Sequence, residues 1–276
     1  MECRTDRKIS LVRCRLEETM MKYAREDIAV AFSGGVDSGL LLKTACEAAK
    51  KMGTKVYAVT FSTRLHPSCD LEIARKVAEE LEVIHKVIVV DELSQEEIQN
   101  NPKNRCYLCK RSLFEKLKEF ADRHSIHTIL EGTNEDDLHV YRPGIQALKE
   151  LGIISPLALL GITKAQVKEL AAEYGISVAS RPSTPCMATR LPYGENLDYE
   201  LLDRIAEGEQ WLRETIGGNI RLRVHGQIAR IELDTEQFMH AIEMRREITE
   251  HLKALGFLYI TLDLEGFRSG SMDQQD

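Results

Sequence analysis

Short apolar runs alternate with longer amphipathic stretches through the first two thirds of the chain. The apolar runs have the length of buried strands, whereas the amphipathic stretches repeat apolar positions at the spacing of a helix. The predicted strands cover residues 28–32, 55–61, 83–90 and 128–131, with a short fifth strand around residues 153–157. The predicted helices cover residues 8–25, 38–52, 70–81, 110–123 and 163–174.

This alternation predicts right-handed βαβ units and therefore an α/β fold with a doubly wound parallel sheet. In such a sheet, ligands bind at the carboxyl ends of the strands. Three stretches follow strand ends in this way: the turn after Phe32, the pair Phe61-Ser62, and Gly132-Thr133-Asn134. We therefore expect these three stretches to converge on one crevice.

The pattern changes after Arg181, where turn-rich segments at residues 182–185 and 192–194 replace the alternation of strands and helices. Beyond them the predicted elements are a helix, two strands, a second helix and a last strand, at residues 198–214, 220–224, 228–233, 236–255 and 259–264. This order predicts a small α+β domain that contains an antiparallel hairpin. The expected domains are residues 1–185 and 195–276, joined by a linker at 186–194 that carries Cys186.

Composition narrows the class of protein. The chain has 276 residues, enough for one large domain and a small one. Its net charge of −7 argues against a nucleic acid as an obligatory partner. The charged N-terminus lacks a signal-peptide pattern and no stretch approaches the length of a membrane span, so we expect a cytoplasmic protein without a membrane partner. Seven cysteines, an odd number without a secretory context, predict reduced thiols.

The strongest motif follows the first strand and reads Ser33-Gly34-Gly35-Val36-Asp37-Ser38. Paired glycines let the backbone approach a ligand, and the serine hydroxyls and the N–H groups of the next helix point to the same place. This combination predicts a cradle for a polyphosphate, although the Walker pattern GxxxxGK[ST] is absent. Asp37 is a candidate ligand of the accompanying magnesium ion. The alternative is a plain strand-to-helix turn that Asp37 and Ser38 cap.

The string SGGVDS resembles the PP-loop ATP pyrophosphatases, which split ATP into AMP and pyrophosphate and adenylate a substrate oxygen. The resemblance implies ATP and Mg²⁺ as cofactors. The motif residues expected to hold them are Ser33, Gly34, Gly35, Asp37 and Ser38. Residues at the neighbouring strand ends are expected to complete the nucleotide site: Phe61, Ser62, Gly132 and Thr133.

A second motif, Cys106-Tyr107-Leu108-Cys109, places two thiols three residues apart. Two thiolates at this spacing bind one metal or cluster, or form a redox pair. A closed zinc site would lack ligands, because there is no second CxxC and no His/Cys pair at zinc spacing nearby. Together with Cys186, three cysteines without an obvious fourth ligand suit a [4Fe–4S] cluster with one open iron. The alternative is a pair of buried thiols at a helix start.

An acidic stretch at residues 131–137 follows the fourth predicted strand. Its carboxylates are candidates to bind Mg²⁺ or the ribose, with a solvated acidic turn as the alternative. Arg142 follows shortly afterwards and is available for an anionic substrate.

The small domain carries a concentration of basic residues. Arg221, Arg223 and His225 alternate along a predicted strand, so they share one of its faces. Three basic groups on one face favour either a phosphate site or a solvated surface. Glu232, on the next strand, is a candidate to pair with them or to help bind a metal.

Three further motifs indicate which branch of the superfamily the chain resembles. They are C-x-x-x-R-x-P-Y-G from Cys186, R-x-R-x-H-x-x-x-A-R-I-E from Arg221, and L-D-L-x-G-F-R-S-G from Leu262. Together with SGGVDS and the YRPG of residues 141–144, they resemble the LarE sulfurtransferases over nearly the whole chain.

The resemblance implies a role in making the nickel-pincer nucleotide, the cofactor of lactate racemase. In that chemistry ATP adenylates a carboxylate of a small nucleotide, pyridinium-3,5-biscarboxylic acid mononucleotide, and sulfur displaces AMP to leave a thiocarboxylate. Adenylation makes sense because it turns a carboxylate oxygen into a good leaving group. The resemblance implies substrate-binding roles for Thr189, Arg190, Arg221 and Arg223, and places Cys186 at the sulfur-transfer centre. We also expect a homo-oligomer.

One departure concerns the source of the sulfur. In one type of LarE a lone cysteine, matching Cys186, gives up its own sulfur and becomes dehydroalanine. Here Cys106 and Cys109 are also present, which favours the type in which three catalytic cysteines hold a [4Fe–4S] cluster and an extra sulfide on it is donated. The sequence does not identify the sulfide donor.

Two alternative functions come from other classes. A PP-loop tRNA thiolase can also use three cysteines and a cluster, but it needs an RNA-binding surface that the acidic charge does not favour. An ATP-dependent amidase-type synthetase or a nucleotide-binding module would leave the three cysteines without a role.

Overall fold

A computed structural model describes residues 2–66, 68–140, 142–178, 185–268 and 270–272. The chain divides into two compact units. The first comprises Met1–Thr63, Ser68–Asp91 and Asn104–Thr184, and the second comprises Arg64–Pro67, Glu92–Lys103 and Pro185–Asp276. The second unit therefore includes two short segments from the first half of the chain. The predicted turn at residues 182–184 and the motif positions Tyr141 and Ser269 lie outside the described residues.

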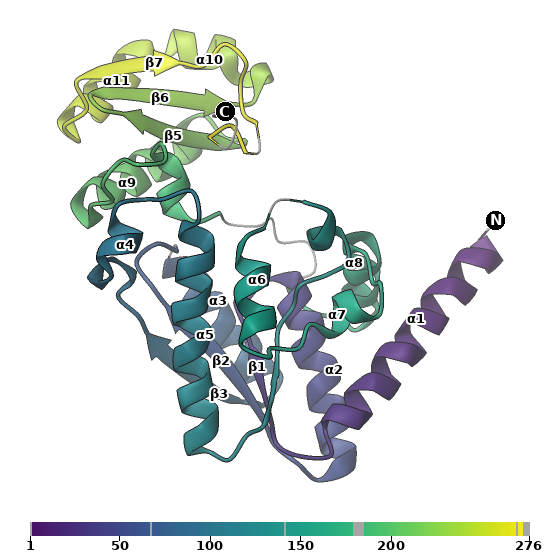
Figure 1. Ribbon diagram of the computed structural model, residues 1–276. Helices are drawn as coiled ribbons and strands as arrows, with labels where there is room; N and C mark the ends of the chain where they lie inside the picture. Colours follow the sequence, from purple (N-terminus) through teal and green to yellow (C-terminus); the bar gives the residue numbers. More distant parts are fainter. Residues whose placement is uncertain (1, 67, 141, 179–184, 269, 273–276) are drawn as a thin grey trace. The chain divides into compact units, whose positions relative to one another are not determined.

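The first unit is built on four parallel strands in the order β3-β2-β1-β4 (Figure 1). The strands are β1 (Ile28–Ala31), β2 (Val56–Ser62), β3 (Ile84–Val89) and β4 (Thr128–Leu130). Ile28 of β1 lies opposite Val56 of β2 and Thr128 of β4. Because β1 is an inner strand, the loop that follows it lies between the ends of its two neighbours. The predicted α/β fold with a parallel sheet is confirmed.

Helices cover both faces of this sheet (Figure 1). Ile28 and Val30 of β1 point into a core shared with α1, α2, α3 and α8, whereas Ala29 points into a second core shared with α5 and α6. Burial on both faces explains why the inner strand β1 appears in the sequence as a continuous apolar run, whereas the edge strand β3 is largely exposed. The helices are α1 (Glu2–Tyr23), α2 (Val36–Met52), α3 (Ser68–Glu80), α5 (Arg105–Arg123), α6 (Gly144–Glu150) and α8 (Lys164–Glu173).

The short fifth strand predicted around residues 153–157 is wrong. Ile154 forms a single parallel bridge with Leu130, and a short helix, α7 (Pro156–Leu159), begins two residues later. Proline suits the first position of a helix because its missing N–H needs no partner there. Pro156 therefore ends the extended segment before a strand can form.

The second unit contains a three-stranded sheet in the order β5-β6-β7. β5 (Ile220–His225) and β6 (Ile228–Leu233) form the predicted antiparallel hairpin, and β7 (Tyr259–Leu262) runs parallel to β6. The predicted helix at 236–255 is interrupted, because the backbone of Met244 leaves the helical region. The helices are α4 (Glu96–Gln99), α9 (Tyr199–Thr215), α10 (Phe238–Glu243) and α11 (Arg245–Ala254), with 3₁₀ turns at Glu92–Ser94, Met187–Arg190 and Thr235–Gln237.

Asn101 explains how an early segment becomes part of the second unit. Its side chain is fully buried, and its Nδ2 donates to Pro192 O at 2.7 Å. Its own carbonyl accepts a hydrogen bond from Gly194 N at 2.9 Å. The predicted second turn-rich segment is thus held by hydrogen bonds to the main chain and to the side-chain amide of Asn101.

No helix in the described part of the chain is both long enough and apolar enough to cross a membrane.

Candidate active site

The loop after β1 turns sharply before α2 begins. Gly34 has a φ of +74°, a left-handed angle that residues with side chains rarely adopt. Two serines bridge the turn: Ser33 N donates to Ser38 Oγ at 3.3 Å, and Ser38 Oγ donates to Gly35 O at 3.2 Å. No side chain caps α2 at Gly35, so the first N–H groups of the helix suit an anion.

Gly132 lets the loop after β4 approach the start of α2. A Cβ at this position would lie only 2.8 Å from the backbone nitrogen of Ser38, closer than real Cβ atoms come. From the same loop, Asn134 Nδ2 donates to Asp37 Oδ1 at 3.1 Å. The structure therefore brings together the SGGVDS loop and the stretch 132–134.

Phe61 and Ser62 form the end of β2, where the strand pairs with β3. The pairing of β2 with β1 ends three residues before Ser62, at Val59 opposite Ala31, so β2 extends past the start of the phosphate loop. The ring of Phe61 packs against Phe114 of α5 with centroids 5.7 Å apart. This contact places the Phe61 side chain in the core beneath α5.

Glu131 is buried directly after β4 and holds the next two residues in place. Its Oε1 accepts from Thr133 N at 3.0 Å and its Oε2 accepts from Thr133 Oγ1 at 2.8 Å, while Ser155 Oγ also donates to it. Lys110 Nζ of α5 lies 3.7 Å from Oε2. Glu131 therefore supports Thr133 and joins this loop to α5.

Asp37 lies in the first turn of α2 and does not cap it. Its Oδ2 forms an ion pair with Nζ of Lys164, the first residue of α8, while Oδ1 accepts from Asn134. The side chains of Asp37 and Lys164 are 22% and 38% exposed, so a ligand can reach both. Lys164 was not predicted as a site residue, since it lies 127 residues beyond Asp37 and only the fold brings the two together.

Arg142, the candidate for an anionic substrate, pairs with Asp137 at 2.9 Å and is more than half exposed. Asp137 in turn accepts a hydrogen bond from Asn134 N at 3.1 Å. Because its guanidinium is exposed, Arg142 can be reached by an incoming anion while it contacts Asp137.

Cys106 and Cys109 lie in the first two turns of α5, which begins earlier than the predicted residue 110. Residues three apart on a helix share a face, so the two thiols are neighbours. Cys106 is exposed and Cys109 is half-buried, and neither forms a disulfide. Nη2 of the buried Arg105 lies 3.9 Å from Cys106 Sγ.

Cys186 belongs to the second unit and immediately precedes a 3₁₀ turn, Met187–Arg190. Its carbonyl oxygen accepts from Thr189 Oγ1 at 2.7 Å and from Arg190 Nη1 at 3.3 Å. The thiol is half-buried and free of disulfides. Thr189 and Arg190 therefore hold the turn that carries this sulfur.

Arg190 and Glu209 form a bidentate ion pair with both side chains only 2% exposed. Arg190 Nε lies 2.7 Å from Glu209 Oε1, and Nη2 lies 3.0 Å from Oε2. Burial alone would raise the pKa of Glu209, but the hydrogen bonds and charge of Arg190 hold that pKa below its usual value. Leu222 N also donates to Oε1 at 2.9 Å, which attaches the pair to β5.

Arg223 is buried and forms an ion pair with a carboxylate. Its Nε donates to Glu232 Oε2 at 3.1 Å and its Nη1 donates to Thr189 O at 2.7 Å. Glu232 is wholly buried, and its Oε1 accepts from Arg230 and from Ser271. Arg223 is therefore part of a buried ion-pair network rather than of a solvated surface. Glu232, the candidate magnesium ligand, lies inside this network.

Arg221 differs from its neighbour. Its guanidinium is half-buried, donates to Ile220 O at 2.7 Å and lies over the ring of Phe267 at 5.1 Å. Among the residues that the structure describes, no carboxylate lies within ion-pair distance of it. Burial, followed by the nearby charge of Arg190, lowers the pKa of Arg221. Of the two predicted strand arginines, Arg221 is the one whose charge remains available.

Within the described ranges, no three His, Cys, Asp or Glu side chains are grouped as a metal site. Cys106 and Cys109 belong to the first unit and Cys186 to the second. The three-cysteine cluster therefore stays a prediction.

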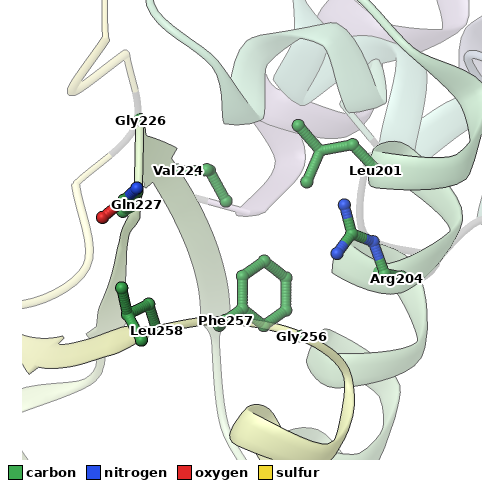
Figure 2. A pocket seen from close by; sticks show the side chains of 8 residues that line it. All are labelled: Leu201, Arg204, Val224, Gly226, Gln227, Gly256, Phe257 and Leu258. Carbon is green, nitrogen blue, oxygen red and sulfur yellow. The ribbon is translucent and has the colours of Figure 1, made fainter.

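The second unit also contains a cavity of about 370 Å³ (Figure 2). Figure 2 shows Leu201 and Arg204 of α9 facing Phe257 and the turn of the β5–β6 hairpin. Arg204 Nη1 donates to Leu255 O at the end of α11 at 3.4 Å, a favourable place for a cation. None of the predicted site residues lines this cavity. Its one lining arginine, Arg204, donates to the C-terminal end of α11.

Two residues that hold predicted site residues in place were not predicted, although the sequence contains a signal for each. Glu209 is a charged residue in the apolar stripe of α9, between Ile205 and Leu212, and a buried charge implies a partner. Lys164 directly follows the capping residue Thr163, at the end of a helix that favours acidic residues.

A family model for the PP-loop domain matches residues 10–140. The chain is 33% identical over 246 residues to the pyridinium-3,5-bisthiocarboxylic acid mononucleotide synthase of Lactiplantibacillus plantarum, covering 89% of this chain and 88% of that protein. It is 36% identical over 268 residues to an uncharacterized protein of Synechocystis sp., covering 96% of this chain and 98% of that protein. An uncharacterized protein of Methanocaldococcus jannaschii is 33% identical over 248 residues, with coverages of 90% and 93%.

Proposed function

The chain belongs to the LarE family of ATP-using PP-loop enzymes, and from this premise we propose that it converts a carboxylate of pyridinium-3,5-biscarboxylic acid mononucleotide into a thiocarboxylate. The relative from L. plantarum is named for the bisthiocarboxylic product. The observation that carries the proposal is the turn at residues 33–38, which aims uncapped helix N–H groups at the place where Asp37 offers a reachable carboxylate. That arrangement suits a magnesium-bound triphosphate.

The first half-reaction is adenylation. A carboxylate oxygen of the substrate forms a bond to the α-phosphorus of ATP, and the bond from that phosphorus to its bridging oxygen breaks. Pyrophosphate leaves with the electron pair. Ser33, Gly34, Gly35 and Ser38 would hold the phosphates, and a magnesium ion at Asp37 would neutralise charge on the leaving group. Phe61, Ser62, Gly132 and Thr133 would surround the nucleotide, and Arg142 would meet an anionic group of the substrate.

The second half-reaction transfers sulfur. A sulfur nucleophile bonds to the carbonyl carbon of the acyl-adenylate, and the bond from that carbon to the AMP oxygen breaks. If the nucleophile is Cys186 itself, a thioester forms. Loss of the Cα proton and cleavage of the Cβ–Sγ bond then leave a thiocarboxylate and dehydroalanine. Thr189 and Arg190 hold the turn of Cys186, while Arg221 would bind the substrate phosphate beside the buried Arg223.

We favour a [4Fe–4S] cluster on Cys106, Cys109 and Cys186 as the sulfur carrier. The chemistry of the donors fits: none of the three thiols forms a disulfide, and the first two share a helix face beside a guanidinium. Such a cluster, held by three cysteines, leaves one iron open to an exogenous sulfide. The chain's own part would be to supply these three thiols as ligands.

The test combines three measurements on protein purified without oxygen. Mixing it with Mg·ATP and the biscarboxylic mononucleotide should release pyrophosphate and yield a product in which sulfur replaces oxygen, as measured by mass spectrometry. Pyrophosphate release in the presence of bulk tRNA but without the mononucleotide would contradict the proposal. Iron and acid-labile sulfide, at about four irons per chain, would support the cluster. A colourless active protein that loses the sulfur of Cys186 would assign the sacrificial route instead.

We expect the enzyme to work as a homo-oligomer in the cytoplasm. Light scattering coupled to size-exclusion chromatography measures the first of these expectations directly, since the chain mass is 31.3 kDa.

A further inference from the structure

The cavity of the second unit is a space that the proposed reaction does not use. Its volume of about 370 Å³ lies within the range of small-molecule sites, about 300–1,000 Å³. Figure 2 shows Arg204 extending toward the space between Leu201 and Phe257. Val224 also lines the cavity, and it alternates along β5 with the strand arginines. The cavity therefore lies behind the face of β5 that carries the predicted substrate residues.

Arg204 does not pair with the acidic residue that its own helix offers. Glu200 lies four residues before it on α9, the spacing and order at which a glutamate and an arginine pair on a helix. Among the described residues, however, no carboxylate lies within ion-pair distance of Arg204. Its guanidinium is half-buried, with the central carbon 5.9 Å from the centre of the Phe257 ring. The side chain is thus directed at the cavity rather than at the surface charges of α9.

The end of α11 does not account for this arginine, because that end closes itself. Phe257 N donates to Leu252 O at 3.1 Å. Gly256 N donates to Lys253 O at 2.9 Å, which completes a Schellman motif. Arg204 Nη1 adds only a 3.4 Å contact to the carbonyl that precedes Gly256, at the long limit of a hydrogen bond. The other N–H groups of the guanidinium have no partner among the described residues.

The surroundings of Arg204 determine the charge of the ligand that fits. A guanidinium binds a carboxylate through two parallel N–H···O bonds. Arg204 is the one cation among the lining residues. The start of α9 offers no further positive end, since the Asp198 side chain already accepts from Glu200 N and Leu201 N, both at 3.2 Å. One positive charge suits a monoanion. The mononucleotide substrate, with two carboxylates and a phosphate, is a poor match.

We propose that this cavity is a binding site for a small organic monocarboxylate with an apolar body, separate from the nucleotide site. The carboxylate pairs with the uncommitted N–H groups of Arg204. The apolar body lies against the ring of Phe257 and the side chain of Leu201. Burial of the apolar body supplies affinity, and the ion pair fixes the orientation of the ligand.

The test uses 3-phenylpropanoate, which joins one carboxylate to a phenyl ring, and its neutral analogue 3-phenylpropanamide. Both are titrated into the full chain with labelled leucine and valine methyl groups. Binding is followed by NMR at the lining residues Leu201, Val224 and Leu258. We expect the acid to shift these methyl signals and to bind at least about tenfold more tightly than the amide, because its hydrogen bonds join two charged groups.

Three variants test the walls of the cavity. Arg204→Met removes the charge but keeps a long side chain, so it should weaken binding of the acid at least about tenfold and leave the amide unaffected. Arg246→Met is the matched control, since Arg246 is exposed on α11 and does not line the cavity. It should bind both probes as the wild type does. Leu201→Trp fills the cavity and should weaken binding of both probes.

Equal affinities of the wild type for the acid and the amide would overturn the inference, as would equal affinities of Arg204→Met and Arg246→Met for the acid. If Arg204→Met does not fold, the comparison of acid with amide and the Leu201→Trp variant still decide. Unshifted methyl signals in the wild type, together with a lower melting temperature of Arg204→Met, would show that Arg204 only braces the end of α11 and would overturn the inference too. None of these measurements uses ATP or the mononucleotide, so they are independent of the proposed function.

Discussion

The two units both place ion pairs at predicted site residues, but the pairs differ in burial. Asp37 and Lys164 in the first unit are partly exposed, whereas Arg190 with Glu209 in the second unit is almost wholly buried. An exposed pair is weak and can exchange partners with a ligand. A buried, bidentate pair cannot do so without leaving a charge unpaired in a low dielectric. The first pair therefore suits binding, and the second suits the positioning of other groups.

This difference divides the substrate residues that the family resemblance implies. Arg190 and Arg223 are both committed to buried carboxylates and both hold the segment of Thr189. Arg221 retains an uncommitted charge on the neighbouring part of β5. We expect Arg221 and Thr189 to contact the substrate, with Arg190 and Arg223 as positioning residues.

Cys186→Ala should have the largest effect and separates the two half-reactions. Formation of thiocarboxylate should be lost, because both sulfur routes need this thiol, while pyrophosphate release should largely remain. Product mass spectra and a pyrophosphate assay on the same sample measure this. The control is Cys46→Ala, since burial raises the pKa of Cys46 to about 11 and leaves it an inert thiol. Unchanged product formation by Cys186→Ala would remove Cys186 from the chemistry.

Glu209→Ala should cause the largest loss of stability. Removing one partner of a buried pair leaves the Arg190 guanidinium uncompensated, which costs about 3–5 kcal/mol. Arg213 provides a matched control, since it contacts the same carboxylate at 3.2 Å from a half-exposed position. Arg213→Ala should cost about 1 kcal/mol or less. Free energies of unfolding from denaturant titrations give both values, and equal losses would contradict the distinction between buried and exposed pairs.

Gly132→Ala should have an intermediate effect, because its Cβ would meet the backbone of Ser38. Forcing an atom into a packed site costs about 1–3 kcal/mol. Gly35→Ala is the control, since its Cβ would meet only Ser33 Oγ at 3.4 Å, an ordinary contact. The free energies of unfolding of the two variants are compared. A Gly132→Ala protein as stable as the Gly35→Ala protein would mean that the loop can shift away from α2 without cost.

The sequence was sufficient for the sheet and for the phosphate loop, because both depend on local patterns. Buried parallel strands appear as apolar runs, and the turn at Gly34 lies within six consecutive residues of one motif. The helix after it begins at Val36, two residues earlier than the predicted residue 38. The error at residues 153–157 has a local cause as well: apolar composition outweighed the helix-starting position of Pro156.

The partners of the site residues could not be predicted in the same way. Lys164 meets Asp37, and Glu209 meets Arg190, only because separate elements pack together. Alternation along β5 correctly placed Arg221 and Arg223 on one face, but it could not tell which arginine would find a carboxylate. Glu232 on β6 lies opposite Arg221 in the strand register, but its carboxylate pairs with Arg223. This pairing depends on how the side chains of the two strands pack.

Two histidines, one in each unit, should give a small pH dependence of stability. Burial lowers the pKa of His85 below 6.5, with Arg75 adding to the effect, and burial and then Arg230 lower the pKa of His225. A lowered pKa means that the unfolded chain binds more protons, so the free energy of unfolding should fall as the pH drops below about 6.5.

The environment of His85 shows what protonation would change in the first unit. The hydroxyl proton of Thr60 is donated to Phe32 O at 2.7 Å, so the 2.8 Å contact from Thr60 Oγ1 requires His85 Nε2 to donate. Nδ1 is then the site that gains a proton. His85→Gln and His225→Gln should each flatten part of the slope between about pH 5.5 and 7.5, measured by denaturant titration. An unchanged slope in both variants would assign the pH dependence to other groups. A change in His85→Gln alone would assign it to the contact between His85 on β3 and Thr60 on β2, whose hydroxyl donates to Phe32 O at the start of the phosphate loop.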